Sequence, residues 1–278
     1  MEPPRRPRYR SGMTSGQTTS AQTIGDHLRD WRQRRRLSQL DLALEAEIST
    51  KHLSFLETGR SQPSREMVLR LADHLGVPLR ERNVLLVSAG YAPVFPQRPL
   101  ADPALEAARR AVDLVLKGHE PYPALAVDRH WTLLAHNAAV PPLLAGADAA
   151  LLAPPVNVLR LSLHPGGLAP RIENLGEWRA HILARLHQQI DATADAVLVK
   201  LMDELAAYPV PATARHKGSV NPDYAGVVVP LRLRTDAGIL SLFSTTTIFG
   251  TPVDITLAEL AIESFFPADA ASADMLRR

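Results

Sequence analysis

Hydrophobic residues recur at helical spacing in the first third of the chain. Ile24, Leu28 and Trp31 fall at positions i, i+4 and i+7, so they share one face of a helix. Serines then stand directly before further short apolar stretches, and serine is a preferred N-cap because its hydroxyl accepts a backbone N–H of the first turn. Residues 22–91 are therefore predicted to form an all-α domain of five short helices, which begin at Thr23, after Ser38, after Ser49, after Ser64 and at Pro78.

The pattern changes after a proline-rich stretch. Residues 92–103 contain four prolines and cannot continue a helix, so residues 92–102 are predicted to be a linker. Beyond it, helical spacing predicts helices over residues 103–118, around Trp178 and from Val197, and runs of branched and aromatic residues predict strands over 124–127, 131–135, 226–234 and 239–249. Thr256 and Glu259 form a capping box, which predicts a last helix that ends at Pro267. This mixture indicates an α+β domain over residues 103–270, followed by a tail over residues 271–278.

Composition narrows the class of protein. A chain of 278 residues with 46% hydrophobic residues is long enough for two domains. No run approaches the roughly 18 to 20 apolar residues of a membrane span, and the start lacks the apolar core of a signal peptide. A cytoplasmic protein without membrane insertion is therefore expected. The absence of cysteine excludes disulfides, thiolate nucleophiles and Cys-ligated zinc.

Charge is distributed unevenly along the chain. Residues 1–100 hold 16 Lys and Arg against 10 Asp and Glu, a balance of +6, whereas residues 101–278 hold 15 against 19, a balance of −4. The first part therefore suits a polyanion such as DNA. Residues 1–21, with four arginines among polar residues, are predicted to be a disordered basic arm. This arm is either a solvated tail or a non-specific contact to phosphates.

Residues 39–58 meet the requirements of a helix-turn-helix. Two helices packed at a steep angle need a small residue where they touch, which Ala43 supplies, and apolar residues such as Leu53 and Leu56 that hold the second helix. Polar side chains at the start of the second helix then point outward, where they can reach base edges in the major groove. A plain helical bundle with a polar face is the alternative interpretation of such a pair.

The five helices together give a more specific signal. The segments Leu37-Ser38-Gln39, Ile48-Ser49-Thr50, Leu53-Ser54-Phe55-Leu56-Glu57-Thr58-Gly59-Arg60 and Pro63-Ser64 closely resemble the Cro/C1-type (XRE) helix-turn-helix family. The resemblance implies that Gln39 contacts a phosphate and braces the recognition helix, that Thr50, Lys51 and Phe55 read bases, and that residues 60–64 follow the DNA backbone. The chain departs from the family at Glu47, where glycine is usual, and a left-handed non-glycine residue costs about 1 kcal/mol or more. The candidate DNA-binding residues are Gln39, Ser49, Thr50, Lys51, His52, Ser54, Phe55, Arg60, Ser61 and Ser64.

The second domain carries no recognisable chemistry motif. Residues 101–278 lack a glycine-rich phosphate loop, a Gly-x-Ser-x-Gly elbow and a His-Glu-x-x-His zinc pair. His130 and His136 are six residues apart, as are His181 and His187, and neither spacing brings the two imidazoles together on one face. We therefore expect surface or singly hydrogen-bonded histidines, with no catalytic residue, metal ligand or cofactor.

Segments of this domain instead resemble the MmyB-like ligand-binding domain. They are residues 122–137, residues 174–182 and, late in the chain, residues 229–234 with 242–254. In that family the domain directly follows an XRE module, as it does in this chain. The resemblance implies a PAS-like antiparallel sheet with helices closing one face, and a pocket that in some members accepts a fatty-acid-like molecule.

Strand alternation predicts which side chains would line such a pocket. Alternate residues of a strand share one face, and a helix packed on that face would supply the lid. Ordinary core packing is the alternative for each of these side chains. The candidate ligand-binding residues are Leu125, Val127, Trp131, Leu133, Leu242 and Thr246 on the strands, with Trp178 and Ile182 on the helix.

These observations predict a sequence-specific, dimeric transcription regulator, associated with the nucleoid in a bacterial cytoplasm. Its partners would be double-stranded DNA, a second copy of the chain and a small apolar, fatty-acid-like ligand that modulates operator binding. Two alternatives remain open. A constitutive repressor that uses its second domain only to dimerise would have a filled core there. An enzyme fused to a helix-turn-helix would have a pocket with converging titratable side chains.

Overall fold

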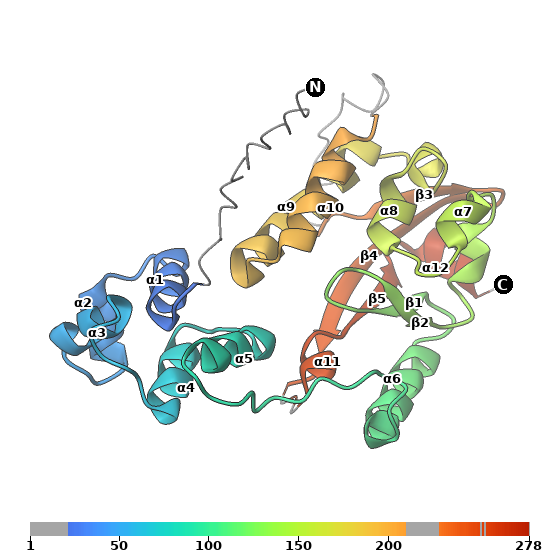
Figure 1. The fold of residues 1–278 in the computed structure, drawn as a ribbon. Helices are drawn as coiled ribbons and strands as arrows, with labels where there is room; N and C mark the ends of the chain where they lie inside the picture. Colours follow the sequence, from blue (N-terminus) through green and yellow to red (C-terminus); the bar gives the residue numbers. More distant parts are fainter. Residues whose placement is uncertain (1–21, 210–227, 251, 253, 278) are drawn as a thin grey trace, which may run out of the picture.

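The computed structural model describes residues 22–209, 228–250, 252 and 254–277. The predicted basic arm, residues 1–21, lies outside the described residues, as does the start of the strand predicted over residues 226–234. The described chain contains an all-helical region followed by a region in which helices surround a β-sheet (Figure 1).

Five helices form the first region, as the apolar spacing predicts. The buried leucines of these helices meet in one core, which includes Leu28, Leu42, Leu71 and Leu86. The side chains of Ser38, Ser49 and Ser64 each accept a backbone N–H in the first turn of a helix, so these predicted N-caps are confirmed, and Thr23 caps α1 in the same way. The helices are α1 (Ile24–Arg34), α2 (Gln39–Glu45), α3 (Thr50–Glu57), α4 (Arg65–His74) and α5 (Leu79–Ser88).

A five-stranded antiparallel sheet organises the second region and confirms the α+β fold. Its strand order is β2-β1-β5-β4-β3. One face is covered by α6 (Glu106–Gly118), which follows a short 3-10 turn, η1 (Pro103–Leu105), and buries Val112 and Leu116 against the sheet. The strands are β1 (Ala124–Val127), β2 (Leu133–His136), β3 (Leu231–Thr235), β4 (Gly238–Ile248) and β5 (Ala261–Pro267).

Other helices cover the opposite face of the sheet (Figure 1). Side chains of α8 (Val158–Leu163), α9 (Leu175–Thr193) and α10 (Ala196–Ala207) form a second core with β3. Its buried residues include Trp178, Ile182, Leu186, Leu201 and Leu233. Three shorter elements lie in the connections between β2 and α9: η2 (Pro141–Leu144), α7 (Ala149–Leu152) and η3 (Ala169–Arg171).

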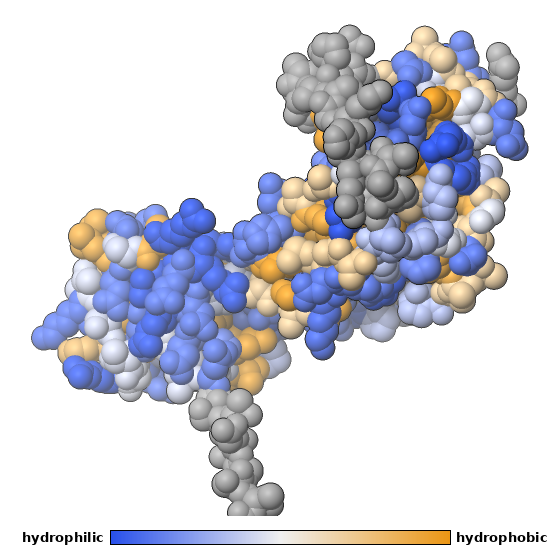
Figure 2. Space-filling view, turned by 90° about the horizontal axis from the view of Figure 1, so that it is seen from above, coloured by the Kyte–Doolittle hydropathy of each residue, from blue (hydrophilic) through white to orange (hydrophobic). Residues whose placement is uncertain are grey.

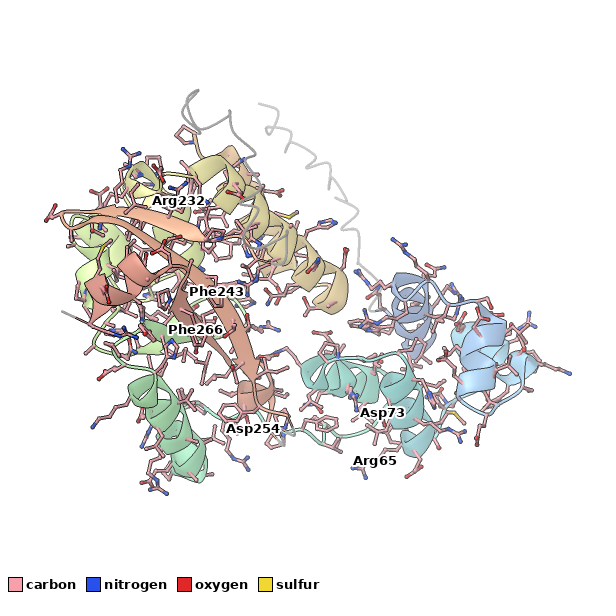
Figure 3. All side chains as sticks on the ribbon, turned by 180° about the vertical axis from the view of Figure 1, so that it is seen from behind. Arg65, Asp73, Arg232, Phe243, Asp254 and Phe266 are labelled. Carbon is pink, nitrogen blue, oxygen red and sulfur yellow. The ribbon has the colours of Figure 1, made fainter. Side chains whose placement is uncertain are left out.

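The end of the chain is part of the sheet region. Residues 271–276, expected to lie in a tail, belong to helix α12 (Ala270–Leu276), which packs on β4. The Ser272 hydroxyl is buried and accepts the backbone N–H of Ser241 at 2.9 Å. Next to this contact, the rings of Phe243 and Phe266 from β4 and β5 stack with centroids 5.4 Å apart (Figure 3).

The predicted last helix was wrong. The capping box of Thr256 and Glu259 does not form, because Asp254 accepts the N–H of Thr256 and caps only a single turn, α11 (Ile255–Ala258). Residues 261–267 then form β5, the central strand of the sheet. A central strand is covered on both faces, so Ile262 and Glu263 are both buried and the alternation that marks a half-exposed strand is lost.

The predicted second strand begins two residues too early. Asp128 accepts the backbone N–H groups of His130 and Thr132 through its carboxylate, and that of Trp131 through its carbonyl oxygen. This turn holds Trp131 at a φ of 66°, outside the extended region, so the strand starts only at Leu133. Trp131 and Leu133 therefore do not share a strand face as expected.

Gly25 allows α1 to pack closely against the end of α3. A Cβ atom at residue 25 would lie 2.7 Å from the carbonyl oxygens of both Leu56 and Glu57. Gly25→Ala is therefore expected to lower the free energy of unfolding of the helical region by about 1 to 3 kcal/mol, despite the higher helix propensity of alanine. The control is Gly118→Ala at the end of α6, where the added carbon would have no neighbour within 4 Å apart from the adjoining residues and the backbone of α6 itself. Equal urea midpoints for both variants would contradict the prediction.

Candidate DNA-binding face and ligand cavity

The turn between α2 and α3 is closed by a residue in the left-handed conformation. Glu47, the residue that departs from the family pattern, adopts a φ of 53°. The backbone N–H of Ile48 donates to the carbonyl oxygen of Ala43 at 2.9 Å, and Ala43 itself is buried where the helices meet. The turn thus keeps the geometry that glycine would favour, at a local cost of about 1 kcal/mol or more.

A buried carboxylate joins three helices of this region. Glu57 at the end of α3 is 2% exposed and accepts Nε and Nη2 of Arg32 from α1 at 2.6 and 2.9 Å. The same carboxylate accepts the amide of Gln39, the first residue of α2, at 2.8 Å. The hydrogen bond to Glu57 raises the pKa of Arg32 above its ordinary value, so the Arg32 guanidinium stays charged. Gln39 is therefore held where it braces the recognition helix, while its phosphate contact stays a prediction.

The outer face of α3 brings several candidate base-reading residues together. The ring of Phe55 is close to two cations, with Lys51 Nζ 5.6 Å and the Arg60 guanidinium carbon 5.8 Å from its centroid. Lys51 and Arg60 are both exposed. These cation–π contacts orient the two positive side chains on the same side of the helix.

The other candidate residues surround this group. Ser49 and Ser64 use their hydroxyls as N-caps, accepting the backbone N–H of His52 and of Met67. Thr50, His52, Ser54 and Ser61 are partly exposed on α3 and in the loop that follows it. Figure 2 shows the helical region as a separate lobe whose visible face is largely hydrophilic.

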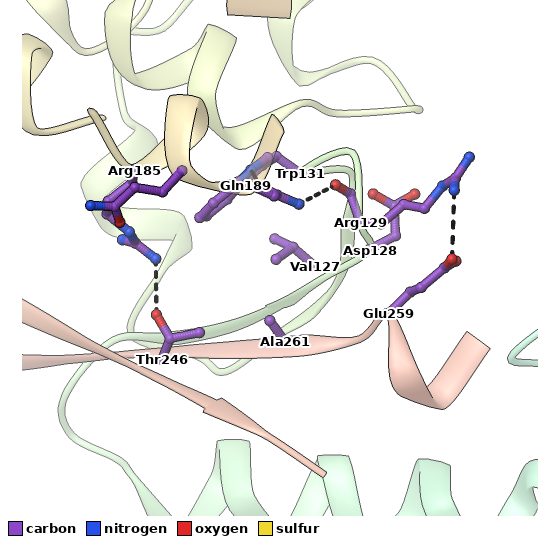
Figure 4. A pocket seen from close by; sticks show the side chains of 10 residues that line it. Val127, Asp128, Arg129, Trp131, Arg185, Gln189, Thr246, Glu259 and Ala261 are labelled. Carbon is purple, nitrogen blue, oxygen red and sulfur yellow. Dashed lines mark hydrogen bonds and ion pairs between the residues drawn. The ribbon is translucent and has the colours of Figure 1, made fainter. Parts of the chain in front are cut away.

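The sheet and the helices enclose a cavity of about 110 Å³. Among the side chains predicted to bind ligand, the lining includes Leu125, Trp131, Leu133, Trp178 and Ile182. Val127 and Thr246 lie outside this lining, and they border an adjoining cleft of about 340 Å³ (Figure 4). Leu242 borders neither space and is fully buried on β4, opposite Leu231.

Sequence reasoning missed the polar part of the cavity wall. Arg185 of α9 donates to the Glu263 carboxylate at 2.7 Å and to the Thr246 hydroxyl at 2.9 Å, and its guanidinium lies 5.1 Å from the centroid of the Trp131 ring. Glu263 is 3% exposed. It could have been identified only if residues 261–267 had been interpreted as a strand, because strand alternation then places Glu263 beside Phe265 on the cavity side.

Two contacts fix the orientation of Trp178, another residue of the cavity wall. The indole N–H of Trp178 donates to the Ser162 hydroxyl at 3.0 Å, and His181 stacks on the Trp178 ring with centroids 5.5 Å apart. Burial, with a smaller contribution from Arg185, lowers the pKa of His181 below its ordinary value, so this imidazole is neutral at pH 7. Trp178 is therefore held in one orientation.

The comparison with known families agrees with this arrangement. The family model for the MmyB-like transcription regulator ligand binding domain matches residues 108–278, more than half of the chain. The chain belongs to the MmyB-like transcription regulators. A model for a helix-turn-helix domain matches residues 23–85. This MmyB-like regulator is thus a DNA-binding transcription regulator with a carboxy-terminal ligand-binding domain.

Comparisons with individual proteins add less. Among solved structures, the clp gene regulator ClgR from Corynebacterium glutamicum is similar over 35% of this chain and 90% of its own, with 26% identity and a TM-score of 0.22. None of the curated proteins matches this MmyB-like regulator. Within the described residues, no helix is long and apolar enough to cross a membrane.

Base reading and backbone positioning can be separated by mutation. Lys51→Ala is expected to weaken binding to the preferred duplex by about 1 to 3 kcal/mol and to relax its sequence preference, because an exposed Lys at the start of α3 reaches base edges. Gln39→Ala and Arg60→Ala should weaken binding to all duplexes by a similar factor. The measurement is selection from random duplexes followed by titration.

Lys200→Ala is the control, because Lys200 is exposed on α10, outside the helical region. The same consensus and the same specificity ratio for Lys51→Ala and for this control would show that Lys51 reads no base.

Proposed function

We propose that this regulator is a homodimer whose carboxy-terminal, PAS-like domain binds a small apolar, fatty-acid-like ligand and thereby changes operator affinity. The observation that carries the proposal is the cavity between the sheet and α8 and α9. Its lining is mostly Leu, Val, Ile, Trp and Phe, with one ion pair, Arg185 with Glu263. Apolar walls with a few fixed polar groups are typical of small-molecule sites.

The two alternatives are less well supported by this geometry. A domain that only dimerises needs no cavity, whereas about 110 Å³ lies open here between sheet and helices. An enzyme needs converging titratable groups, and Glu263 is the single carboxylate in the lining. That carboxylate is already held by Arg185 and Thr246, so it is poorly placed to move a proton.

The size of the cavity bears on the ligand. Sites that bury drug-sized molecules usually measure about 300 to 1,000 Å³. The cavity of about 110 Å³ is smaller, so a medium-length acyl chain enters only if part of the wall moves. Binding therefore requires a conformational change, which a regulator needs if a ligand is to alter DNA affinity.

Mass spectrometry of lipids extracted from the purified protein tests the proposal directly. We expect an amphiphile with an apolar chain to co-purify with the protein. Calorimetry across a series of fatty acids should then show binding, and bound acid should raise the melting temperature of the sheet region. No co-purifying amphiphile and no binding across the series would refute the apolar-ligand proposal.

The cavity is tested as the binding site by Trp178→Ala. Loss of this apolar wall is expected to weaken decanoate binding by about tenfold or more, since burying a large apolar side chain contributes roughly 1.5 to 3 kcal/mol. Leu242→Ala is the control, because Leu242 is also buried in the same domain but borders neither the cavity nor the adjoining cleft. Both variants should lose stability, but only Trp178→Ala should lose affinity in calorimetry. Equal decanoate affinities for the two variants would show that the ligand binds elsewhere.

Homodimerisation follows from the way helix-turn-helix proteins read DNA. Two recognition helices that enter successive major grooves require two half-sites about one helical turn apart. We expect sedimentation analysis to show two chains per duplex on a selected operator with two half-sites. A single chain bound per operator would rule out the dimeric part of the proposal.

A further inference from the structure

An ion pair joins the helical region to the sheet region. Arg80 of α5 donates through Nε and Nη2 to the two carboxylate oxygens of Glu259, each at 2.8 Å. Bidentate pairs of this kind are strong and geometrically specific. Glu259 directly follows α11, which lies beside α5 (Figure 1). A second contact, from Arg35 of the helical region to the carbonyl oxygen of Ala192 in α9, is longer at 3.3 Å.

The linker is anchored to the chain segment that directly precedes Glu259. Asp254 is fully buried, and its carboxylate accepts Nη1 of Arg98 at 3.1 Å (Figure 3). The hydroxyl of Thr256 donates to the carbonyl oxygen of Arg98, and the backbone N–H of Ile255 donates to the carbonyl oxygen of Pro96 at 2.9 Å. Residues 254–259, here named the junction segment, therefore hold both the linker and α5.

The junction segment leads directly into the strand that carries cavity residues. Glu259 lies four positions before Glu263, and β5 begins between them at residue 261. The intervening Leu260 is fully buried, so the chain between the two acids is fixed by packing. A displacement of the cavity wall on β5 is thus passed along the backbone to the partner of Arg80.

Side chains provide a second connection between cavity and junction. The indole N–H of Trp131 donates to Gln189 Oε1 at 2.8 Å, and Gln189 Nε2 donates to the carbonyl oxygen of Arg129 at 2.8 Å. The guanidinium of Arg129 lies 3.5 Å from the carboxylate of Glu259 (Figure 4). It lies 3.4 Å from the carboxylate of Asp195. Arg129 is therefore shared between two acids, and a small movement of its backbone changes its contact with Glu259.

Trp131 borders two spaces. Trp131 and Arg185 line the cavity of about 110 Å³ and also border the cleft of about 340 Å³. A wall with empty space behind it yields most easily, because fewer packing contacts oppose its movement. A ligand that enlarges the cavity would therefore displace Trp131 toward the cleft, which Gln189 also borders, and would change the geometry of the hydrogen bond between Trp131 and Gln189.

We propose that the pair Arg80–Glu259 is a clasp between the DNA-binding region and the ligand-binding domain, which opens when a ligand fills the cavity. This proposal rests on the proposed function of the cavity as a ligand site. Displacement of Trp131 and β5 moves Arg129 and Glu259, and the clasp loses its geometry. The helical region then changes its orientation relative to the sheet region, which alters the spacing of the two recognition helices in a dimer.

The clasp is tested by a distance measurement in the full-length protein with decanoate as the probe. The chain has no cysteine, so spin labels can be placed at two exposed positions, Glu66→Cys on α4 and Arg109→Cys on α6. In the otherwise unchanged chain we expect one narrow distance distribution, which broadens and shifts when decanoate is added. With Glu259→Gln, which weakens the clasp without changing its size, the distribution should be broad from the start and insensitive to decanoate.

Glu204→Gln is the matched control. It weakens another bidentate pair, Arg160–Glu204 with distances of 2.7 and 2.8 Å, which joins α8 to α10 within the sheet region. This control should behave like the unchanged chain. Decanoate should also change affinity for a selected duplex by about 5-fold or more in the unchanged chain and in the control. With Glu259→Gln, the affinity for the duplex should be nearly the same with and without decanoate.

The outcomes separate the clasp from the proposed function. A narrow distribution for Glu259→Gln without ligand overturns the clasp, whatever decanoate does. If calorimetry shows decanoate bound while the distances in the unchanged chain stay the same, the coupling of cavity to clasp is overturned but the cavity remains a ligand site. If decanoate does not bind, the apolar-ligand proposal loses its support, and the comparison of Glu259→Gln with Glu204→Gln still decides whether the clasp holds the two regions together.

Discussion

Strand β5 lies in the middle of the sheet, hydrogen-bonded to β1 along one edge and to β4 along the other. Its side chains therefore divide between two covered faces, with Ile262 toward α6 and Glu263 toward the cavity. A carboxylate buried to this degree is costly unless its oxygens are paired. Arg185 from α9 and Thr246 from β4 provide the partners. The placement of α9 over the sheet, and with it the cavity, thus depends on satisfying one buried acid.

The helical region also contains a buried acid whose partners come from other elements. Glu57 is buried at the end of the recognition helix and is paired with Arg32 and Gln39 from the two preceding helices. Breaking a buried pair of this kind leaves an uncompensated charge, which is far more costly than the pair is stabilising. The two buried acids therefore fix the orientations of two elements: α3 with its predicted DNA-reading face, and α9 with part of the cavity wall.

Much of this fold was predictable because local rules and tertiary packing agree. Serine N-caps and apolar stripes located most of the five helices, and the runs of branched and aromatic residues on either side of residues 235–238 predicted strands β3 and β4, which pair as a hairpin. Prediction failed where tertiary contacts overrode a local signal. Thr256 and Glu259 form a capping box in sequence, but Asp254 takes the cap and Glu259 binds Arg80, more than 170 residues earlier in the chain.

The apolar part of the candidate site was predictable from the sequence, and its ion pair was not. Strand and helix periodicity identified Leu125, Leu133, Trp178 and Ile182 as cavity residues, whereas Trp131 reaches the cavity from a turn and not from the strand predicted for it. The ion pair of Arg185 with Glu263 joins residues 78 positions apart, and no local spacing marks such a pair. On the candidate DNA-binding face, the grouping of Lys51 and Arg60 around Phe55 likewise depends on the turn that follows α3.

The central claim is that the cavity and the DNA-binding region are connected through residues 254–267. Hydrogen–deuterium exchange of the full-length protein, with and without decanoate, tests it most directly. The account predicts faster exchange at the amides of residues 254–260, including Ile255, which donates to Pro96, while amides inside β5 stay protected by the ladders to β1 and β4. Unchanged exchange in residues 254–260, at a decanoate concentration that alters the exchange of α9, would contradict it.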